Sequence, residues 1–429
     1  MTEMKDSGIE WIGEIPKEWD IGKTLYALSM PITDGPHETP ELLLEGVPFV
    51  SAEAVSCGNG HIDFSHIRGY VSEDFYTECC KKYVPELHDI YMIKSGATTG
   101  RVAKVDTDKI FTIWSPLAVF RCDGNRCYYN YLYYFIQSDA YQKQIANKWT
   151  YGTQQNIGMR TLEKLIICFP PLPTQHRIAD YLDDKCGKID RYIEQQKQVI
   201  EKLKAYKQSV ITEAVTKGLD PTVPMKDSGV EWIGEIPEGW EVRKFGRCVS
   251  IRSNLVSPEK YYDYPQISPD SIEKDTGKIV SYKTVKESGV ISWNHYFKKN
   301  QIIYSKIRPL LNKVTIAPFD GLCSADMYPI ETNNDSRFIL YTILSIPFSS
   351  QVGLVTANRV KMPKINQSEL SNIQIVLPPH DEQKTIANYL DKKCFSIDLA
   401  IEKKQTLIDK LTEYKKSLIY EVVTGKKEV

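Results

Sequence analysis

The chain has 429 residues, of which 42% are hydrophobic, 25% charged and 11% aromatic, a composition typical of folded domains and not of disordered segments. Its 54 basic and 55 acidic residues leave a net charge of −1, which argues against an indiscriminate nucleic-acid binder. At about 100–200 residues per domain, this length predicts two to four domains.

The first residues, MTEMKDSGIE, lack the basic and apolar regions of a signal peptide, and the chain contains no apolar run of about 18 residues that could span a bilayer. We therefore expect a cytoplasmic protein with no membrane partner. The ten cysteines are scattered and include no CxxC pair, so we expect reduced thiols.

Two segments of the chain occur twice. MKDSGIEWIGEIPKEW at 4–19 returns as MKDSGVEWIGEIPEGW at 225–240, with 13 of 16 positions unchanged. A second repeat, at 175–216 and 383–424, has an offset of 208. These repeats predict two units, each built from a short motif, a variable block and a helix.

The variable blocks, residues 20–169 and 241–377, are rich in short β-like runs separated by Gly, Pro, Asn and Asp turns. Such runs are VPFVSA, RVAKV and LAVFRC in the first block, and QIIYSKI and LSNIQIVL in the second. Short helices are expected at 128–147 and 336–351. Each block is predicted to be a compact α/β (α+β) domain.

The two blocks resemble each other weakly. Residues 89–102 can be aligned with 301–314, and 156–171 with 364–379, although few residues coincide. Two domains that recognise different sequences would need a shared scaffold with different loops.

After each block comes a heptad pattern typical of long paired helices. The apolar a and d positions are Ile189, Ile193, Ile200, Leu203 and Val210 in the first copy and Ile397, Ile401, Ile408, Leu411 and Leu418 in the second. Matching polar residues interrupt both stripes, namely Gln196 with Lys404 and Lys207 with Lys415. The pattern favours two helices packed on each other in a defined register, and the alternative is that each helix covers its own sheet.

The entry to each long helix is marked by prolines. FPPLPTQ spans 169–175 and LPPHDEQ spans 377–383, and Thr174 and Asp381 are plausible N-caps.

Motifs for catalysis are missing. GATTGRV lacks the spacing and the lysine of a phosphate-binding P-loop, and the two Pro-Pro pairs mark helix entries and not a methyltransferase site. The seven histidines form no HExxH motif. The sequence therefore favours binding over catalysis, with no cofactor or metal in this chain.

Polar loops with small and basic residues are the candidates for DNA binding, because Gln and Asn can pair with adenine, Arg with guanine, and Lys and Thr with phosphates. In the first block these residues are His37, Thr39, Lys94, Thr98, Thr99, Arg101, Gln154, Gln155, Asn156 and Arg160. In the second block they are Arg252, Ser253, Asn254, Lys306, Arg308, Asn312, Lys313, Asn358, Arg359 and Lys361. Taken singly, such residues are more often ordinary exposed loop residues, and only the duplicated frame makes the set suggestive.

The tandem of DSGxEWIGEIPxxW, a block opening with ITDGPHETP and GVPFVS, then PPxxxQxxIAxYLDxKCxxID and a helix ending in VTKG, resembles the specificity subunits of type I restriction-modification systems over essentially the whole chain. The resemblance implies a non-catalytic subunit with two target-recognition domains, each reading half of a bipartite, asymmetric DNA target. It also implies two long antiparallel coiled-coil helices that separate the domains, in a pseudo-twofold internal repeat. One departure is Thr174-Gln175, where the family and the second copy have Glu-Gln.

The partners implied by the resemblance are double-stranded DNA, two methyltransferase subunits and restriction subunits. S-adenosylmethionine, ATP and Mg are expected in those partner subunits. If the helices are antiparallel, the end of the second helix near Thr424 lies beside 4–19, just as Thr216 leads into 225–240.

On this basis the chain divides into four segments: a first target-recognition domain at 1–170, a first spacer helix at 171–217, a linker with the second recognition domain at 218–378, and a second spacer helix at 379–429. Two other functions agree less well with the sequence. A DNA methyltransferase or nuclease acting alone lacks its motifs, and a coiled-coil scaffold without DNA binding leaves two polar-looped domains unexplained.

Overall fold

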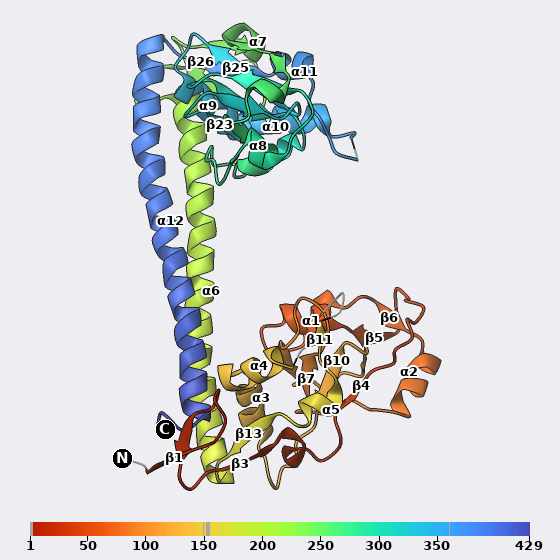
Figure 1. Ribbon diagram of the computed structural model, residues 1–429. Coiled ribbons are helices and arrows are strands. Elements are labelled where there is room, and N and C mark those ends of the chain that lie inside the picture. The colour runs from red at the N-terminus through yellow and green to blue at the C-terminus, as the bar shows by residue number, and fades with distance from the viewer. Residues whose placement is uncertain (1–2, 149, 152–154, 360) are drawn as a thin grey trace. The chain divides into compact units, whose positions relative to one another are not determined.

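The computed structural model describes residues 3–148, 150–151, 155–359 and 361–429 (Figure 1). The chain divides into two compact units, unit 1 with Met1–Gln196 and Thr406–Val429, and unit 2 with Lys197–Gln405. Each unit therefore contains one variable block and one part of each long helix. The division made from the sequence, in which each long helix is a segment of its own, stays a prediction.

The main sheet of unit 1 has four antiparallel strands in the order β4-β10-β7-β8. Their bounds are Thr33–Asp34 for β4, Leu117–Phe120 for β10, Ile90–Ile93 for β7 and Val102–Lys104 for β8. Strands β7 and β10 are buried throughout, because both faces of the sheet are covered. Successive residues alternate between the faces: Ile90 packs with α3 (Tyr129–Gln137), whereas Tyr91 packs with β5 (Val47–Val50).

A smaller sheet in the order β6-β5-β9 completes the domain of unit 1. Strand β5 pairs antiparallel with β6 (Tyr70–Val71) and parallel with β9 (Thr112–Ile113). The predicted runs VPFVSA, RVAKV and LAVFRC contain β5, β8 and β10, as expected. The other elements of this block are η1 (Thr24–Ala27), α1 (Ala52–Cys57), η2 (Phe64–His66), α2 (Glu73–Cys80), β11 (Thr150–Tyr151), β12 (Gln155–Asn156) and α5 (Met159–Leu162).

Unit 2 repeats the main sheet with the same strand order, β17-β25-β22-β23, and the same antiparallel pairing. The bounds are Val249–Ile251 for β17, Met327–Thr332 for β25, Ile302–Ser305 for β22 and Val314–Ile316 for β23. Strands β7 and β22 match in the alignment of 89–102 with 301–314, so the weak similarity of the two blocks reflects one shared fold.

The second sheet of unit 2 has five strands in the order β18-β21-β24-β19-β20. Strand β19 pairs parallel with β24 and antiparallel with β20, which repeats the pairing of β5 with β9 and β6. The bounds are Leu255–Val256 for β18, Pro265–Ile267 for β19, Lys283–Thr284 for β20, Asn294–Phe297 for β21 and Gly321–Cys323 for β24. Around it lie α7 (Phe245–Cys248), η3 (Pro258–Lys260), η4 (Pro269–Ser271), α8 (Val285–Ser288), η5 (Pro309–Leu311) and α11 (Gln367–Asn372).

The sixteen-residue motif folds as the same hairpin in both units, with Met4 opposite Pro16 and Met225 opposite Pro237. A second strand pair then leads into each long helix, β3 with β13 and β16 with β26. The bounds are Met4–Asp6 and Glu14–Pro16 for β1 and β2, Met225–Asp227 and Glu235–Pro237 for β14 and β15, Asp20–Lys23 and Ile166–Phe169 for β3 and β13, and Glu241–Lys244 and Gln374–Leu377 for β16 and β26.

The helices expected at 128–147 and 336–351 are each broken once. The breaks separate α3 from α4 (Asp139–Ala146) and α9 (Ser336–Leu344) from α10 (Ile346–Thr356). They fall at Ser138 and Ser345, whose hydroxyls donate to carbonyls of the preceding turn at 2.6 and 2.7 Å. In the described part of the chain, no single helix has the length and apolarity to cross a membrane, and α9 with α10, bent by 59°, meet that test only as a pair and only by length and composition.

The long helices are α6 (Leu172–Lys217) and α12 (His380–Val423). Thr174 and Asp381 lie inside the first turns, so the prediction that they are N-caps is wrong. The helices begin earlier because Pro171 and Pro379, directly before the first helical residues, already accept hydrogen bonds from the N–H groups of Thr174 and Glu382 at 2.8 and 3.0 Å.

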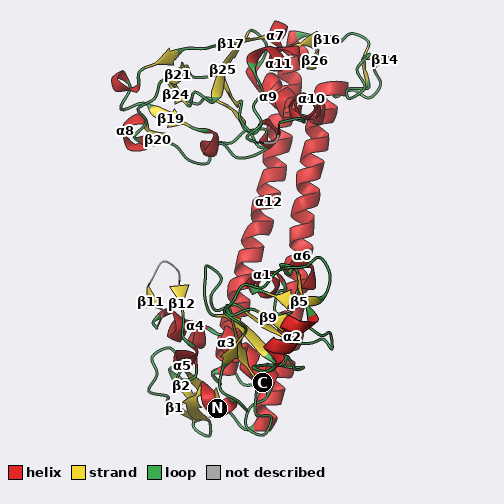
Figure 2. Cartoon of the chain, turned by 90° about the vertical axis from the view of Figure 1, so that its right-hand side faces the viewer, coloured by secondary structure: helices red, strands yellow, loops and turns green. Residues whose placement is uncertain are grey.

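Within each unit, the parts of α6 and α12 lie side by side (Figure 2), and the colouring by residue number in Figure 1 shows that they run in opposite directions. The heptad positions are buried or half-buried along both helices, so the predicted seam between the helices is confirmed. The end of α12 lies beside the first motif as expected, because the Tyr420 hydroxyl donates to the Ile12 carbonyl at 3.2 Å.

Candidate nucleic-acid interface

In unit 1, the loop that follows β7 is bonded to the segment around β12. The Ile157 N–H donates to the Lys94 carbonyl at 2.9 Å, and the Gly96 N–H donates to the Gln155 carbonyl at 3.0 Å. The loop turns sharply at Gly96, whose φ of +100° favours glycine. The predicted DNA-binding residues of unit 1 fall in three polar segments, and two of these, around Lys94–Arg101 and Gln155–Arg160, therefore form one surface.

The third segment, ITDGPHETP, joins this surface through Asp34. The Asp34 carboxylate is 1% exposed and lies 2.5 Å from Lys82 Nζ, 3.2 Å from Lys94 Nζ and 3.3 Å from His37 Nε2. Burial by itself would raise the pKa of Asp34, but hydrogen bonds and charges from the two lysines outweigh burial and hold that pKa below its usual value. The predicted segments of unit 1 thus meet at one end of the main sheet.

The remaining candidates of unit 1 surround this surface. The Thr99 hydroxyl donates to the Gly96 carbonyl at 2.7 Å, and Arg101 Nη1 donates to the Ser56 carbonyl at 3.1 Å, so both side chains brace the loop. Thr98 is half-buried, Gln154 lies outside the described residues, and the exposed candidates are His37, Thr39, Arg101, Gln155, Asn156 and Arg160.

In unit 2, the matching loop makes matching contacts. The Ile365 N–H donates to the Lys306 carbonyl at 2.9 Å, just as Ile157 does to Lys94 in unit 1. The backbone turns without glycine: Arg308 and Asn312 have φ of 45° and 43°, left-handed conformations that are costly for residues with a side chain. Such conformations persist where the surrounding structure enforces them and are common at functional sites.

Two candidates of unit 2 support the loop from within. Asn312 is 3% exposed, and its Nδ2 donates to the Ile343 carbonyl at 3.0 Å. Lys313 Nζ donates to the Pro269 carbonyl at 2.8 Å. Their part in DNA binding stays a prediction, and in the free chain their polar atoms are engaged with the protein.

The arginines of unit 2 differ in how they are held. Arg252 Nε lies 2.6 Å from Glu331 Oε2, and Arg359 Nη1 lies 3.1 Å from Glu369 Oε2, whereas Arg308 is exposed at the turn. Lys306 is half-buried, and the exposed candidates that complete the set are Ser253, Asn254, Asn358 and Lys361.

Two residues at the centre of the unit 1 surface were absent from the sequence-based candidates. Asp34 gives no local signal, because an acidic residue is not expected to contact phosphate. Lys82 lies in CCKKYV, outside the polar loops, and only the tertiary fold brings it to Asp34.

Each long helix is joined to its domain by one buried glutamine. Gln175 accepts a hydrogen bond from the Tyr128 N–H at 2.8 Å, and Gln383, at the repeated position, accepts one from the Asp335 N–H at 3.1 Å. Their Nε2 atoms donate to the carbonyls of Pro170 and Pro378, each at 2.9 Å. These bonds explain why the glutamine is the same in both copies of the repeat.

The residue before that glutamine differs between the copies. Glu382 Oε2 accepts a hydrogen bond from Trp240 Nε1 at 3.0 Å, which ties the second motif to the start of α12. Thr174 holds the matching place in unit 1 and is too short to offer a carboxylate there.

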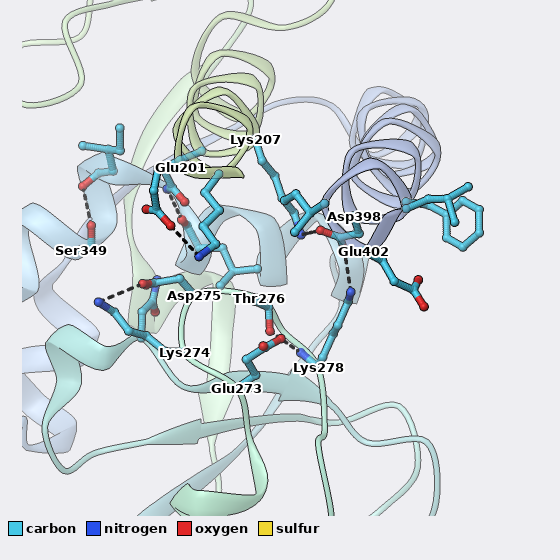
Figure 3. Close-up of a pocket in the computed structure, with 18 residues that line it drawn as sticks. Glu201, Lys207, Glu273, Lys274, Asp275, Thr276, Lys278, Ser349, Asp398 and Glu402 are labelled. Carbon is cyan, nitrogen blue, oxygen red and sulfur yellow. Dashed lines mark hydrogen bonds and ion pairs between the residues drawn. The ribbon is translucent and has the colours of Figure 1, made fainter. Parts of the chain in front are cut away.

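A cavity of about 900 Å³ in unit 2 lies between α6, α12 and the turn at 273–278 (Figure 3). Charges of both signs line it and pair with one another: Asp398 lies 2.8 Å from Lys207 and 2.9 Å from Lys278. Among the described residues, no group of three or more His, Cys, Asp and Glu side chains could hold a metal ion. Of the sequence-predicted DNA-binding residues that the structure describes, Asn312 is the one that lines this cavity.

Comparison with known proteins gives matches along both units. A family model described as "Type I restriction modification DNA specificity domain" matches residues 46–205 and 237–412. The type I restriction enzyme EcoDI specificity subunit of Escherichia coli is 32% identical over 277 residues, which cover 61% of this chain and 62% of that protein. The putative type I restriction enzyme MjaX specificity subunit of Methanocaldococcus jannaschii is 29% identical over 436 residues, which cover 97% and 95% of the two chains.

A solved structure is similar in fold. A chain from work on the "Structural basis underlying complex assembly and conformational transition of the type I R-M system" superposes with a TM-score of 0.70 at 14% identity, covering 96% of this chain and 99% of that one. At this identity the likeness concerns the fold alone.

Proposed function

Because the chain belongs to the family of type I restriction modification DNA specificity domains, we propose that it is the sequence-recognition subunit of a type I restriction-modification complex. In this proposal, each unit reads one half of a bipartite, asymmetric target in double-stranded DNA. The chain itself is a non-catalytic specificity subunit.

The observation that carries the proposal is the duplicated polar surface at the end of the main sheet. Lys94 and Lys306 occupy the same place and make the same backbone bond to a buried isoleucine. The neighbouring side chains differ, with Asn156 in unit 1 where unit 2 has Lys364. One framework with two sets of side chains is suited to reading two different half-sites.

The duplication of the hairpin favours a chain that binds two copies of one partner. Its identical buried residues are explained by packing, but Glu10 and Glu14 in unit 1 and Glu231 and Glu235 in unit 2 are exposed. The fold gives no reason for the same exposed carboxylates in both hairpins. We infer that each hairpin contacts one of two identical methyltransferase subunits.

The remaining parts of the complex follow from this assignment. Restriction subunits complete the assembly, and S-adenosylmethionine, ATP and Mg belong to the partner subunits and not to this chain. The complex acts on DNA in the cytoplasm.

Genome-wide sequencing of methylated adenines tests the proposal. When the chain is produced with its cognate methyltransferase subunit, we expect one motif made of two short half-sites separated by unread base pairs. A single uninterrupted motif would contradict the proposal that each unit reads one half-site. Binding of S-adenosylmethionine by the purified chain alone would support a stand-alone methyltransferase, and a complex without sequence preference would support a scaffold.

A further inference from the structure

Asp34 is a buried carboxylate at the point where the three polar segments of unit 1 meet. Its side chain is 1% exposed and has Lys82, Lys94 and His37 around it. A buried carboxylate is costly unless it is paired, so these contacts are needed for the residue to be tolerated there.

The two lysines have different surroundings. The side chain of Lys94 is 12% exposed, so its ammonium group is committed to Asp34 and has little room to reach a phosphate. The side chain of Lys82 is 48% exposed and also donates to the Gly35 carbonyl at 3.4 Å. Lys94 is therefore mainly an internal connector, while Lys82 presents charge to solvent.

Lys94 connects Asp34 to the rest of the surface. Its side chain reaches Asp34 in β4, its carbonyl accepts the Ile157 N–H at 2.9 Å, and its N–H donates to the Pro116 carbonyl at 2.8 Å. Lys94 therefore links the Asp34 carboxylate to the segment that bears Gln155 and Asn156.

We propose that Asp34 is a positioning residue that holds the recognition segments of unit 1 in place and thereby determines how well this unit discriminates its half-site. The inference rests on the proposed function of the chain. It is specific to unit 1, because Lys306 of unit 2 donates to the Ala325 carbonyl at 2.7 Å and pairs at 3.8 Å with Asp326, a carboxylate that is 36% exposed and not buried as Asp34 is.

The test uses the full chain in complex with its cognate methyltransferase subunits and a pool of duplexes of random sequence as the probe. Bound duplexes are sequenced to give the base preference at every position of both half-sites. For Asp34→Asn we expect discrimination in the half-site of unit 1 to fall about tenfold or more, since a well-placed base contact is worth that much. The half-site of unit 2 should be unchanged.

A double variant separates positioning from stability. Asp34→Asn with Lys94→Met removes the buried pair together, so no buried lysine is left beside a neutral amide, and the protein remains testable if the single variant does not fold. We expect its melting temperature to recover towards that of the wild type while the discrimination of unit 1 stays low. Asp63→Asn is the matched control, because Asp63 bonds only with Ser65 and His66 in the same domain and should leave both half-sites unchanged.

Three results would overturn the inference. Asp34→Asn with both half-sites intact would remove the role of Asp34, and so would a double variant in which stability and discrimination recover together. A loss of preference in both half-sites would show a general effect on the complex. A wild-type complex that selects no bipartite sequence would instead refute the proposed function on which the inference rests.

Discussion

Lys207 of α6 and Asp398 of α12 form an ion pair across the two long helices of unit 2, with Lys207 Nζ 2.8 Å from Asp398 Oδ1. In unit 1, Lys415 of α12 and Asp190 of α6 make the equivalent pair at 2.7 Å. These lysines are the polar interruptions of the heptad stripe. Because a shifted register would leave half-buried charges unpaired, the pairs select one alignment of the helices.

Replacing Lys207 by methionine should destabilise the helix pair of unit 2. We expect the free energy of unfolding to fall by about 1–3 kcal/mol, because the side chain is 11% exposed and its loss leaves Asp398 with Lys278 alone. Urea denaturation followed by far-ultraviolet circular dichroism measures the change. Lys204→Met is the control: this lysine pairs with Glu201 at an exposed site, where a loss below about 0.5 kcal/mol is expected. An equal loss of unfolding free energy in the two variants would contradict the role of the Lys207–Asp398 pair.

Low pH should weaken the ion pair between Asp398 and Lys207. Burial raises the pKa of Asp398, but Lys207 and Lys278 outweigh burial and lower that pKa overall. A carboxyl group with a lowered pKa in the folded state stabilises the fold above its unfolded pKa of about 3.9 and loses that contribution as the pH falls through the folded value. The melting temperature of the wild type should therefore fall more steeply below about pH 4 than that of Asp398→Asn. Parallel curves for the two proteins would exclude this linkage.

The buried glutamines should be needed for the joint between helix and domain. Gln383→Ala leaves the Asp335 N–H and the Pro378 carbonyl without their partner in a buried place, which costs about 1–3 kcal/mol for each unsatisfied group. Thermal denaturation should show the loss for Gln383→Ala and for Gln175→Ala. Gln195→Ala, at an exposed site on α6, should remain near the wild type. The prediction fails if all three variants melt together.

Arg308 and Lys361 are both exposed in unit 2, but they should act differently on DNA. If Arg308 contacts a guanine, Arg308→Ala relaxes one position of the half-site by about 1–3 kcal/mol. If Lys361 contacts a phosphate, Lys361→Ala should weaken binding to all DNA sequences alike. It should also reduce the slope of the logarithm of the binding constant against the logarithm of the salt concentration by about one. Binding of the assembled complex to matched and mismatched duplexes at several salt concentrations distinguishes the two. An Arg308 variant with unchanged base preference would remove that residue from the interface.

The sequence predicted the framework well, because its signals are local and periodic. The apolar residues of the seam from Ile189 to Val210 recur in a heptad pattern. The two hairpins were predictable as equivalent elements because the same motif occurs twice in the sequence. Long-range contacts were not predictable in the same way. Nothing in CCKKYV points to Asp34, and nothing near Asn312 shows that its side chain is buried against the Ile343 carbonyl. The breaks at Ser138 and Ser345 were missed because serine is compatible with a helix until its hydroxyl bonds to the preceding turn.

Exchange of one variable block determines whether each unit reads its own half of the target. Residues 20–169 are replaced by the corresponding block of another member of the family, and methylated adenines are mapped genome-wide in a host that also produces the methyltransferase subunit. We expect a new bipartite motif in which one half-site has changed and the other is the same as in the wild type. A motif in which both halves change, or in which neither does, would contradict it.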